Sequence, residues 1–134
     1  MNLVRLRIAV VDDEEPVRKA LKRLLRSAGM DVETYPSGAD FLDAMRTCEP
    51  DCLVLDLHMP GVNGFEVQSR LAQLGTRLPV VVVTGHDTPE SNKRALAGGA
   101  AAYLLKPIDD RVLLDAIAAA VSKLTDSRAG GARE

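Results

Sequence analysis

The chain lacks tryptophan, and phenylalanine and tyrosine together supply only 3% of its 134 residues. Aromatic rings on which nucleic-acid bases could stack are therefore scarce. No charge of one sign dominates, because 17 basic and 19 acidic residues give a formal net charge of −2 and the basic residues form no block. This charge pattern is not that of a nucleic-acid-binding surface, and we expect no direct contact with DNA.

Long hydrophobic runs are also missing. No apolar stretch approaches the roughly 20 residues that a membrane-spanning helix needs, and the first residues show no signal-peptide pattern. We therefore expect a soluble, cytoplasmic protein without a membrane partner. The length is typical of one domain, which would bury about two-thirds of the surface that its unfolded chain exposes.

Cysteine occurs only twice, as Cys48 and Cys52. The spacing is not CxxC, and the additional cysteine or histidine ligands of a metal site are absent around it. We therefore interpret both cysteines as small buried hydrophobic side chains.

Strand-like apolar runs alternate along the chain with segments of helical periodicity. The runs predict strands at 6–11, 31–35, 52–56, 79–84 and 101–106. Helices are expected from Pro16 to Ala28, from Ser37 through Met45, and over 65–74, 89–96 and 109–124, with turn or capping residues between them. This order predicts an α/β fold with a parallel sheet, helices on both faces and right-handed crossovers. We expect the domain to span 1–124, and 125–134 to be a polar tail or the start of a linker.

Four of the expected strands end on side chains that could bind metal or phosphate. Asp12 and Asp13 follow the first strand, Asp56 ends the third, Thr84 ends the fourth, and Lys106 ends the fifth. Because the carboxyl ends of parallel strands meet at one edge of a sheet, these side chains should converge on a single site. Three carboxylates, a hydroxyl and an ammonium are the parts of a metal-assisted phosphoryl-transfer centre.

The three carboxylates indicate a bound cation. Each like-charged pair at about 4 Å costs on the order of 4 kcal/mol at an effective dielectric constant of 20, and a cation removes that cost. Carboxylate oxygens suit Mg²⁺, and the sequence shows no histidine pair or thiolate cluster to favour zinc. Asp56, alone on its strand, is the natural nucleophile toward phosphorus. Thr84 and Lys106 would hold the phosphoryl oxygens.

Several motifs together resemble one family, the receiver domains of two-component response regulators. They are Asp12-Asp13, the run from Asp56 to Gly64, Thr84-Gly85 and Lys106-Pro107. The resemblance covers about residues 6–124 and implies a flavodoxin-like (βα)5 fold, a doubly wound parallel sheet with strand order 2-1-3-4-5. The sequences of Leu57 to Gly61 and of Thr84-Gly85-His86 are similar to those of receivers that precede a LuxR-type helix-turn-helix, the FixJ and NarL group.

The resemblance implies a role for each matching residue. Asp56 would accept a phosphoryl group from a phosphohistidine on a sensor histidine kinase. Mg²⁺ would bind Asp13 and Asp56 directly, Asp12 through water, and the backbone carbonyl of His58. Thr84, Gly85 and Lys106 would surround the phosphoryl group.

The resemblance also implies a conformational switch. Thr84 and Tyr103 would be its moving side chains, and the surface of helix 89–96, strand 101–106 and helix 109–124 would bind a partner or a second copy. His58 and His86 would flank the phosphoryl group and modulate its hydrolysis. The Lys106-Pro107 peptide is a candidate for the cis form, which is rare among X-Pro bonds in general.

Two alternatives to a phosphorylated receiver remain open at this point. One is a Mg²⁺-dependent phosphatase that forms an aspartyl phosphate, although the chain has no DxD nucleophile motif. The other is a pseudo-receiver that binds partners without phosphorylation. A receiver would be no enzyme in the usual sense, since it would catalyse only its own phosphorylation and dephosphorylation. No output domain follows residue 124, so we expect either a free-standing receiver or part of a longer transcription factor.

Overall fold

This computed structural model describes the backbone of residues 5–132 and the side chains of residues 5–123. Its sheet contains five parallel strands in the order β2-β1-β3-β4-β5. The strands are β1 (Arg7–Val11), β2 (Asp31–Tyr35), β3 (Cys52–Asp56), β4 (Val80–Thr84) and β5 (Ala102–Leu105). The predicted fold class and strand order are confirmed.

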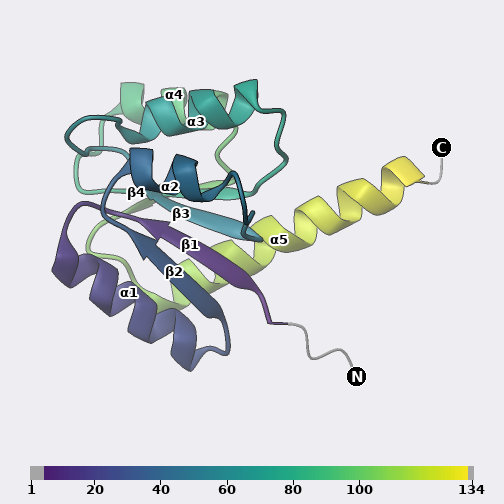
Figure 1. Cartoon of the computed structure of the whole chain (residues 1–134), viewed down its shortest axis with the longest axis horizontal. Helices are drawn as coiled ribbons and strands as arrows, with labels where there is room; N and C mark the ends of the chain where they lie inside the picture. The colour runs from purple at the N-terminus through teal and green to yellow at the C-terminus, as the bar shows by residue number, and fades with distance from the viewer. Residues whose placement is uncertain (1–4, 133–134) are drawn as a thin grey trace.

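Helices cover both faces of the sheet. They are α1 (Glu15–Ser27), α2 (Gly38–Ala44), α3 (Gly64–Gln73), α4 (Pro89–Ala97) and α5 (Asp110–Ala132). Figure 1 shows α1 and α5 below the sheet and α2, α3 and α4 above it. None of the helices within residues 5–132 has the length and apolar character needed to cross a bilayer.

The alternation of side chains along each central strand supplies two cores. From β1, Ile8 and Val10 face the layer that contains Leu25 of α1 and Ile117 of α5, whereas Val11 faces the layer that contains Phe41. All residues of β3 and β4 are buried. Strands covered on both faces are apolar almost throughout, so the polar residues at their ends stand out.

Side-chain caps fix where several helices begin. The Ser37 hydroxyl accepts a hydrogen bond from the Asp40 amide, and the Thr88 hydroxyl accepts one from the Ser91 amide. Asn63 and Glu66 form a reciprocal capping box at the start of α3. Helix α1 has no side-chain cap and instead carries Pro16 in its first turn.

Helix α5 is longer than the sequence predicts. Its backbone continues to Ala132, whereas the apolar periodicity predicts an end at Leu124. Gly130 and Gly131 suggest a linker, but each glycine costs a helix only about 1 kcal/mol, and a helix that is already nucleated extends readily. The domain boundary after residue 124 stays a prediction.

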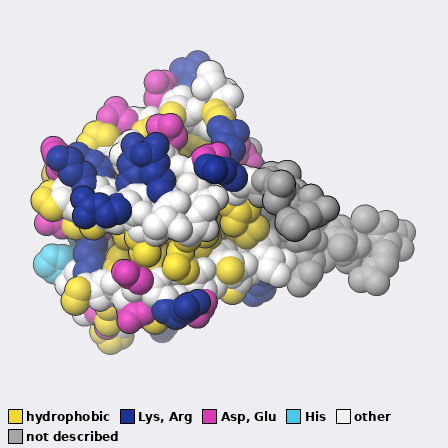
Figure 2. Space-filling view, turned by 90° about the horizontal axis from the view of Figure 1, so that it is seen from below, with side chains coloured by type: hydrophobic (Ala, Val, Ile, Leu, Met, Phe, Trp, Pro, Cys, Tyr) yellow, Lys and Arg dark blue, Asp and Glu magenta, His cyan; other side chains and the backbone are white. Residues whose placement is uncertain are grey.

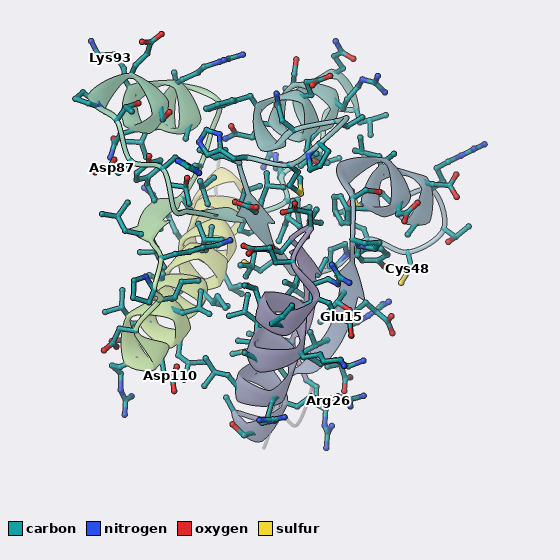
Figure 3. The ribbon with its side chains drawn as sticks, turned by 90° about the vertical axis from the view of Figure 1, so that its left-hand side faces the viewer. Glu15, Arg26, Cys48, Asp87, Lys93 and Asp110 are labelled. Carbon is teal, nitrogen blue, oxygen red and sulfur yellow. The ribbon has the colours of Figure 1, made fainter. Side chains whose placement is uncertain are left out.

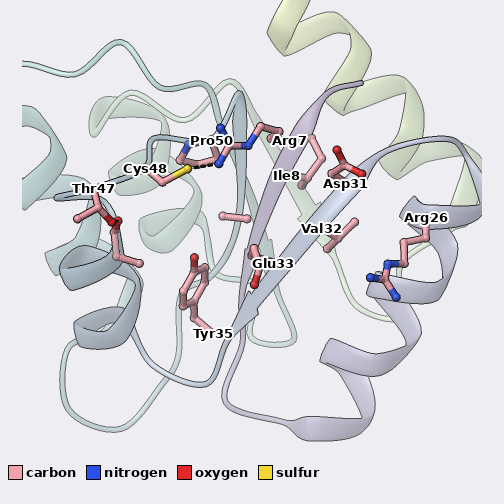
Figure 4. Close-up of a pocket in the computed structure, with 12 residues that line it drawn as sticks. Arg7, Ile8, Arg26, Asp31, Val32, Glu33, Tyr35, Thr47, Cys48 and Pro50 are labelled. Carbon is pink, nitrogen blue, oxygen red and sulfur yellow. Dashed lines mark hydrogen bonds between the residues drawn. The ribbon is translucent and has the colours of Figure 1, made fainter. Parts of the chain in front are cut away.

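The expectation for the cysteines is correct for Cys52 and wrong for Cys48. Cys52 is buried in β3, whereas Cys48 is exposed. Helix α2 already ends at Ala44, so Cys48 lies in the connection to β3 and outside the packed face of the helix. There its sulfur contacts the guanidinium of Arg7, which lines a pocket of about 530 Å³ at the β2 edge (Figure 4).

Candidate metal and phosphoryl site

The predicted site residues converge at the carboxyl edge of the sheet. Asp12 follows β1, Asp56 and Thr84 are the last residues of β3 and β4, and Lys106 follows β5. Figure 3 looks onto this edge, with Glu15 of α1, Asp87 of the β4–α4 loop and Asp110 of α5 around it. The chain thus brings together side chains from four connections.

Asp12, Asp13 and Asp56 form a compact acidic cluster. One carboxylate oxygen from each lies within 4.8 Å of the others. Asp12 and Asp56 are buried, whereas Asp13 is exposed at the mouth of the cluster. Three carboxylates with one side open to water fit an ion that prefers oxygen ligands and keeps several waters, as Mg²⁺ does.

Lys106 reaches into this cluster. Its Nζ lies 2.8 Å from Asp12 Oδ2, 3.5 Å from Glu14 Oε1 and 3.8 Å from Asp56 Oδ1. Burial alone would lower the pKa of Lys106, but the carboxylates of Asp12, Asp56 and Glu14 together raise it. The ammonium therefore stays charged and partly neutralises two buried carboxylates.

The carboxyl group of Asp56 has a raised pKa. Burial, and after it the charge of Asp12, raises the pKa of Asp56 from 3.8 to about 6, although Lys106 and the backbone amide of His58 act in the opposite direction. A cation beside this group would favour its ionised form. Nearby positive charge thus increases the fraction of Asp56 that is in the ionised, nucleophilic form.

Two residues that sequence reasoning missed hold Asp12 in place. The Glu14 amide donates a hydrogen bond to Asp12 Oδ1 at 2.9 Å, and Arg18 donates one to the Asp12 carbonyl at 2.8 Å. The first contact is an Asx-turn, in which an aspartate bonds the amide two residues later. That local pattern is a signal available from sequence, whereas the Arg18 contact depends on where α1 lies.

Gly64 holds the connection that follows Asp56. Its amide donates to the carbonyl of Leu57 at 3.0 Å. A Cβ atom at this position would lie 2.6 Å from the Asp56 backbone oxygen and 2.7 Å from Leu57 Cα. Because both are backbone atoms, only glycine allows α3 to begin this close to the end of β3. Sequence reasoning identified Gly64 only as a turn residue.

Thr84 and Gly85 lie beside Lys106. The buried Thr84 hydroxyl accepts a hydrogen bond from the His86 amide at 3.0 Å and contacts the His86 carbonyl at 3.4 Å. A Cβ atom on Gly85 would meet only Lys106 Cδ, at 3.9 Å. The hydroxyl thus organises the loop after β4, while Gly85 leaves space open toward Lys106.

Tyr103 lies outside the acidic cluster, on β5, opposite Val82 of β4. Its hydroxyl is buried and makes no hydrogen bond within the described part of the chain. Burial, and after it the nearby Asp87, raises the pKa of this hydroxyl. The Lys106-Pro107 peptide is cis, as the family resemblance implies.

His58 and His86 extend from the two loops that flank the cluster. Both are exposed, and their rings meet edge to face with centroids 5.0 Å apart. Sequence reasoning placed each near the site but did not recognise them as a pair.

Comparison with known proteins gives one consistent family. Residues 8–118 match the model of the response regulator receiver domain. The transcriptional regulatory protein TdiR of Thauera aromatica is 39% identical over 86% of this chain and 51% of its own length. The transcriptional regulatory protein FixJ of Azorhizobium caulinodans is 37% identical over 88% of this chain and 56% of its own.

Solved structures from this family have the same fold as this chain. The crystal structure of FixJ-N superposes with a TM-score of 0.82 at 34% identity, covering 89% of this chain and 95% of that one. The present chain spans about half the length of the curated relatives that it matches. On its sequence, its strand order and its cluster of strand-end residues, the chain belongs to the response regulator receiver domain family.

Proposed function

We propose that this chain is a phosphorylation switch in which Asp56 accepts the phosphoryl group. The observation that carries the proposal is the position of Asp56 within one cluster that also holds two more carboxylates and the Lys106 ammonium. Asp56 Oδ would attack phosphorus while the bond from phosphorus to the donor breaks, a P–N bond for a phosphohistidine and a P–O bond for acetyl phosphate. The product is an acyl phosphate on Asp56.

The residues of the cluster fit Mg²⁺. Asp12, Asp13 and Asp56 would hold it together with the backbone carbonyl of His58. When bound, the ion neutralises negative charge on the carboxylates and the transferring phosphoryl group. Lys106 and Thr84 would contact phosphoryl oxygens, and the open space at Gly85 would leave room for them.

Phosphorylation would then move the loop after β4. Thr84 contacts the backbone of His86, so a hydrogen bond that its hydroxyl donates to a phosphoryl oxygen would replace the one that it donates to the His86 carbonyl at 3.4 Å. The Tyr103 hydroxyl is buried and lies near Asp87 of the same loop, so a shift of the loop would change the surroundings of this ring. The phosphoryl group can shift this equilibrium only by its different free energy in the two states.

The output surface would be the face formed by α4, β5 and α5. Leu96, Leu105 and Val112 expose large apolar side chains there. We propose that this face binds a partner, a second copy of the chain, or an attached output domain. The chain itself would make no DNA contact.

The phosphoryl donor would be a sensor histidine kinase in the cytoplasm. An apolar groove of about 310 Å³ between α1 and the start of α5 reaches Lys106. Figure 2 views this side and shows hydrophobic side chains in a band beside Lys and Arg side chains. A donor helix seated in this groove would place its histidine near Asp56, and the loop residues His58 and His86 would influence how fast the acyl phosphate is hydrolysed.

Two measurements separate this function from the alternatives. With acetyl phosphate and Mg²⁺, a receiver forms at most one equivalent of phosphoprotein. It hydrolyses phosphomonoesters no faster than they are hydrolysed in buffer without protein. Rapid turnover of a panel of phosphomonoesters would instead indicate a phosphatase. A chain that binds its partner equally well in the wild type and in the Asp56→Ala variant, with no phosphoprotein formed, would be a pseudo-receiver.

A further inference from the structure

The chain has only two histidines, and the fold brings them together. His58 lies in the β3–α3 loop and His86 in the β4–α4 loop, and their ring centroids are 5.0 Å apart. We propose that the two imidazoles form a chelating site for a zinc-class divalent ion, separate from the carboxylate site for Mg²⁺. The sequence alone shows no histidine pair, because these residues are neighbours only in the folded chain.

The spacing of the rings fits one shared ion. In a zinc site each imidazole nitrogen lies about 2.0–2.1 Å from the metal, so each ring centroid lies about 3.2 Å from it and two rings at the tetrahedral angle lie about 5 Å apart. The observed separation of 5.0 Å is close to this value. The rings now meet edge to face at 78°, so one ring must turn, and the broad χ2 torsion of histidine makes that turn inexpensive.

Both histidines stand on fixed backbone. His58 lies between Leu57 and Met59, which are both buried. The backbone of His86 is bonded through its amide to the buried Thr84 hydroxyl. Because the two Cα atoms are already held, ion binding would order only two exposed side chains, and little conformational entropy is lost.

The chemistry of the donors selects the ion. Imidazole nitrogen favours Zn²⁺, Cu²⁺ and Ni²⁺, whereas carboxylate oxygen favours Mg²⁺. Both rings are exposed, so water would complete the coordination. The ion would tie together the two loops that flank Asp56 in the unphosphorylated chain.

A zinc titration of the tag-free chain, with Mg²⁺ in excess to occupy the acidic cluster, tests the site. Each of the two imidazoles is followed by its ring-proton NMR signals, which are assigned with the His58→Ala and His86→Ala variants. We expect both signals to shift together as Zn²⁺ is added, and calorimetry to give one ion per chain. Each alanine variant should bind Zn²⁺ at least tenfold more weakly.

The Asp13→Asn variant separates the two metal sites, and its affinity for Zn²⁺ should stay within threefold of the wild type. The proposal is overturned if only one imidazole signal or neither responds, or if either alanine variant binds Zn²⁺ as the wild type does. Loss of zinc binding in Asp13→Asn with retention in the histidine variants would place the ion in the acidic cluster. One ion per two chains would mean bridging between molecules and would also overturn it.

Discussion

Lys106 forms a 2.8 Å ion pair with Asp12 across the carboxyl edge of the sheet, although β3 and β4 lie between the strands that these two residues follow. Only 1% of the Asp12 side chain and 18% of the Lys106 side chain are exposed. The same ammonium lies 3.8 Å from Asp56 Oδ1. Lys106 therefore holds the acidic cluster together before any phosphoryl group arrives, and it is within a short movement of the proposed acceptor.

Replacement of Lys106 by methionine should destabilise the chain in the absence of Mg²⁺. It leaves the buried Asp12 without its cation, and we expect a loss of about 2 kcal/mol in the free energy of unfolding, below the range for a fully buried pair. Urea unfolding measures this loss. The matched control is Lys19→Met, since Lys19 also forms a 2.8 Å ion pair, with Glu15, but at an exposed position.

The control should lose less than about 0.5 kcal/mol, as exposed pairs within a helix do. Equal losses in the two variants would contradict the role given to the Lys106–Asp12 pair. Mg²⁺ should restore part of the stability of Lys106→Met, because the ion supplies the missing positive charge.

Asp56→Asn should stabilise the Mg²⁺-free chain above pH 6. In the folded chain the pKa of Asp56 is raised from 3.8 to about 6, so its contribution to stability is complete below pH 3.8 and is lost as the pH rises through 6. Asparagine avoids that loss. The pKa difference sets an upper limit of about 3 kcal/mol, and solvent screening at the open mouth of the cluster reduces it to about 1–2 kcal/mol.

The measurement is urea unfolding of wild type and Asp56→Asn at several pH values between 4 and 8. The two stability curves should converge toward pH 4 and separate as the pH rises through 6. Asp115→Asn, at an exposed position of α5, is the control for removing one negative charge. Parallel curves for wild type and Asp56→Asn would contradict the raised pKa.

Gly64→Ala should disturb the loop that follows Asp56. The new Cβ would lie 2.6 Å from the Asp56 backbone oxygen, and backbone atoms cannot give way as a flexible side chain does. We expect a loss of about 1–3 kcal/mol in unfolding free energy, as for other overpacked sites. Thermal or urea unfolding checks this, with Gly85→Ala as a sterically permitted control for stability. A Gly64→Ala chain as stable as the control would show that the loop adapts without cost.

Tyr103→Phe should leave stability unchanged or raise it by up to about 1 kcal/mol. The variant removes a buried hydroxyl that makes no hydrogen bond among the side chains that the structure describes, and such a group carries a desolvation cost without compensation. Urea unfolding of the wild type and the variant at neutral pH measures this difference in stability. A loss of more than about 1 kcal/mol would mean that the hydroxyl makes a stabilising contact in solution.

Sequence reasoning succeeded where a local pattern determines position. The acidic pair after β1 and the single residues that end β3 and β4 had to meet, because parallel strands share one carboxyl edge. Ser37 and Thr88 were recognisable as caps from their place before a helical run. The family motifs then gave each strand-end residue an expected role.

Sequence patterns did not predict contacts that depend on the direction of a long side chain, or the residue at which a helix ends. The Lys106 side chain crosses toward Asp12, and the histidine rings approach each other from two loops; neither contact follows from strand order. Cys48 is exposed because α2 ends early, and α5 continues because glycine weakens a helix without stopping it. Each of these outcomes depends on a difference of a few kcal/mol or less between arrangements that the sequence pattern permits.

Intact-mass spectrometry can detect directly whether Asp56 is phosphorylated with the help of a metal ion. Wild type and Asp56→Ala are each incubated with acetyl phosphate, with Mg²⁺ or with a chelator. We expect the added mass of one phosphoryl group on the wild type with Mg²⁺, and none with the chelator or on Asp56→Ala. Equal labelling of the variant would contradict this expectation, as would an unlabelled wild type with both acetyl phosphate and a phosphohistidine donor.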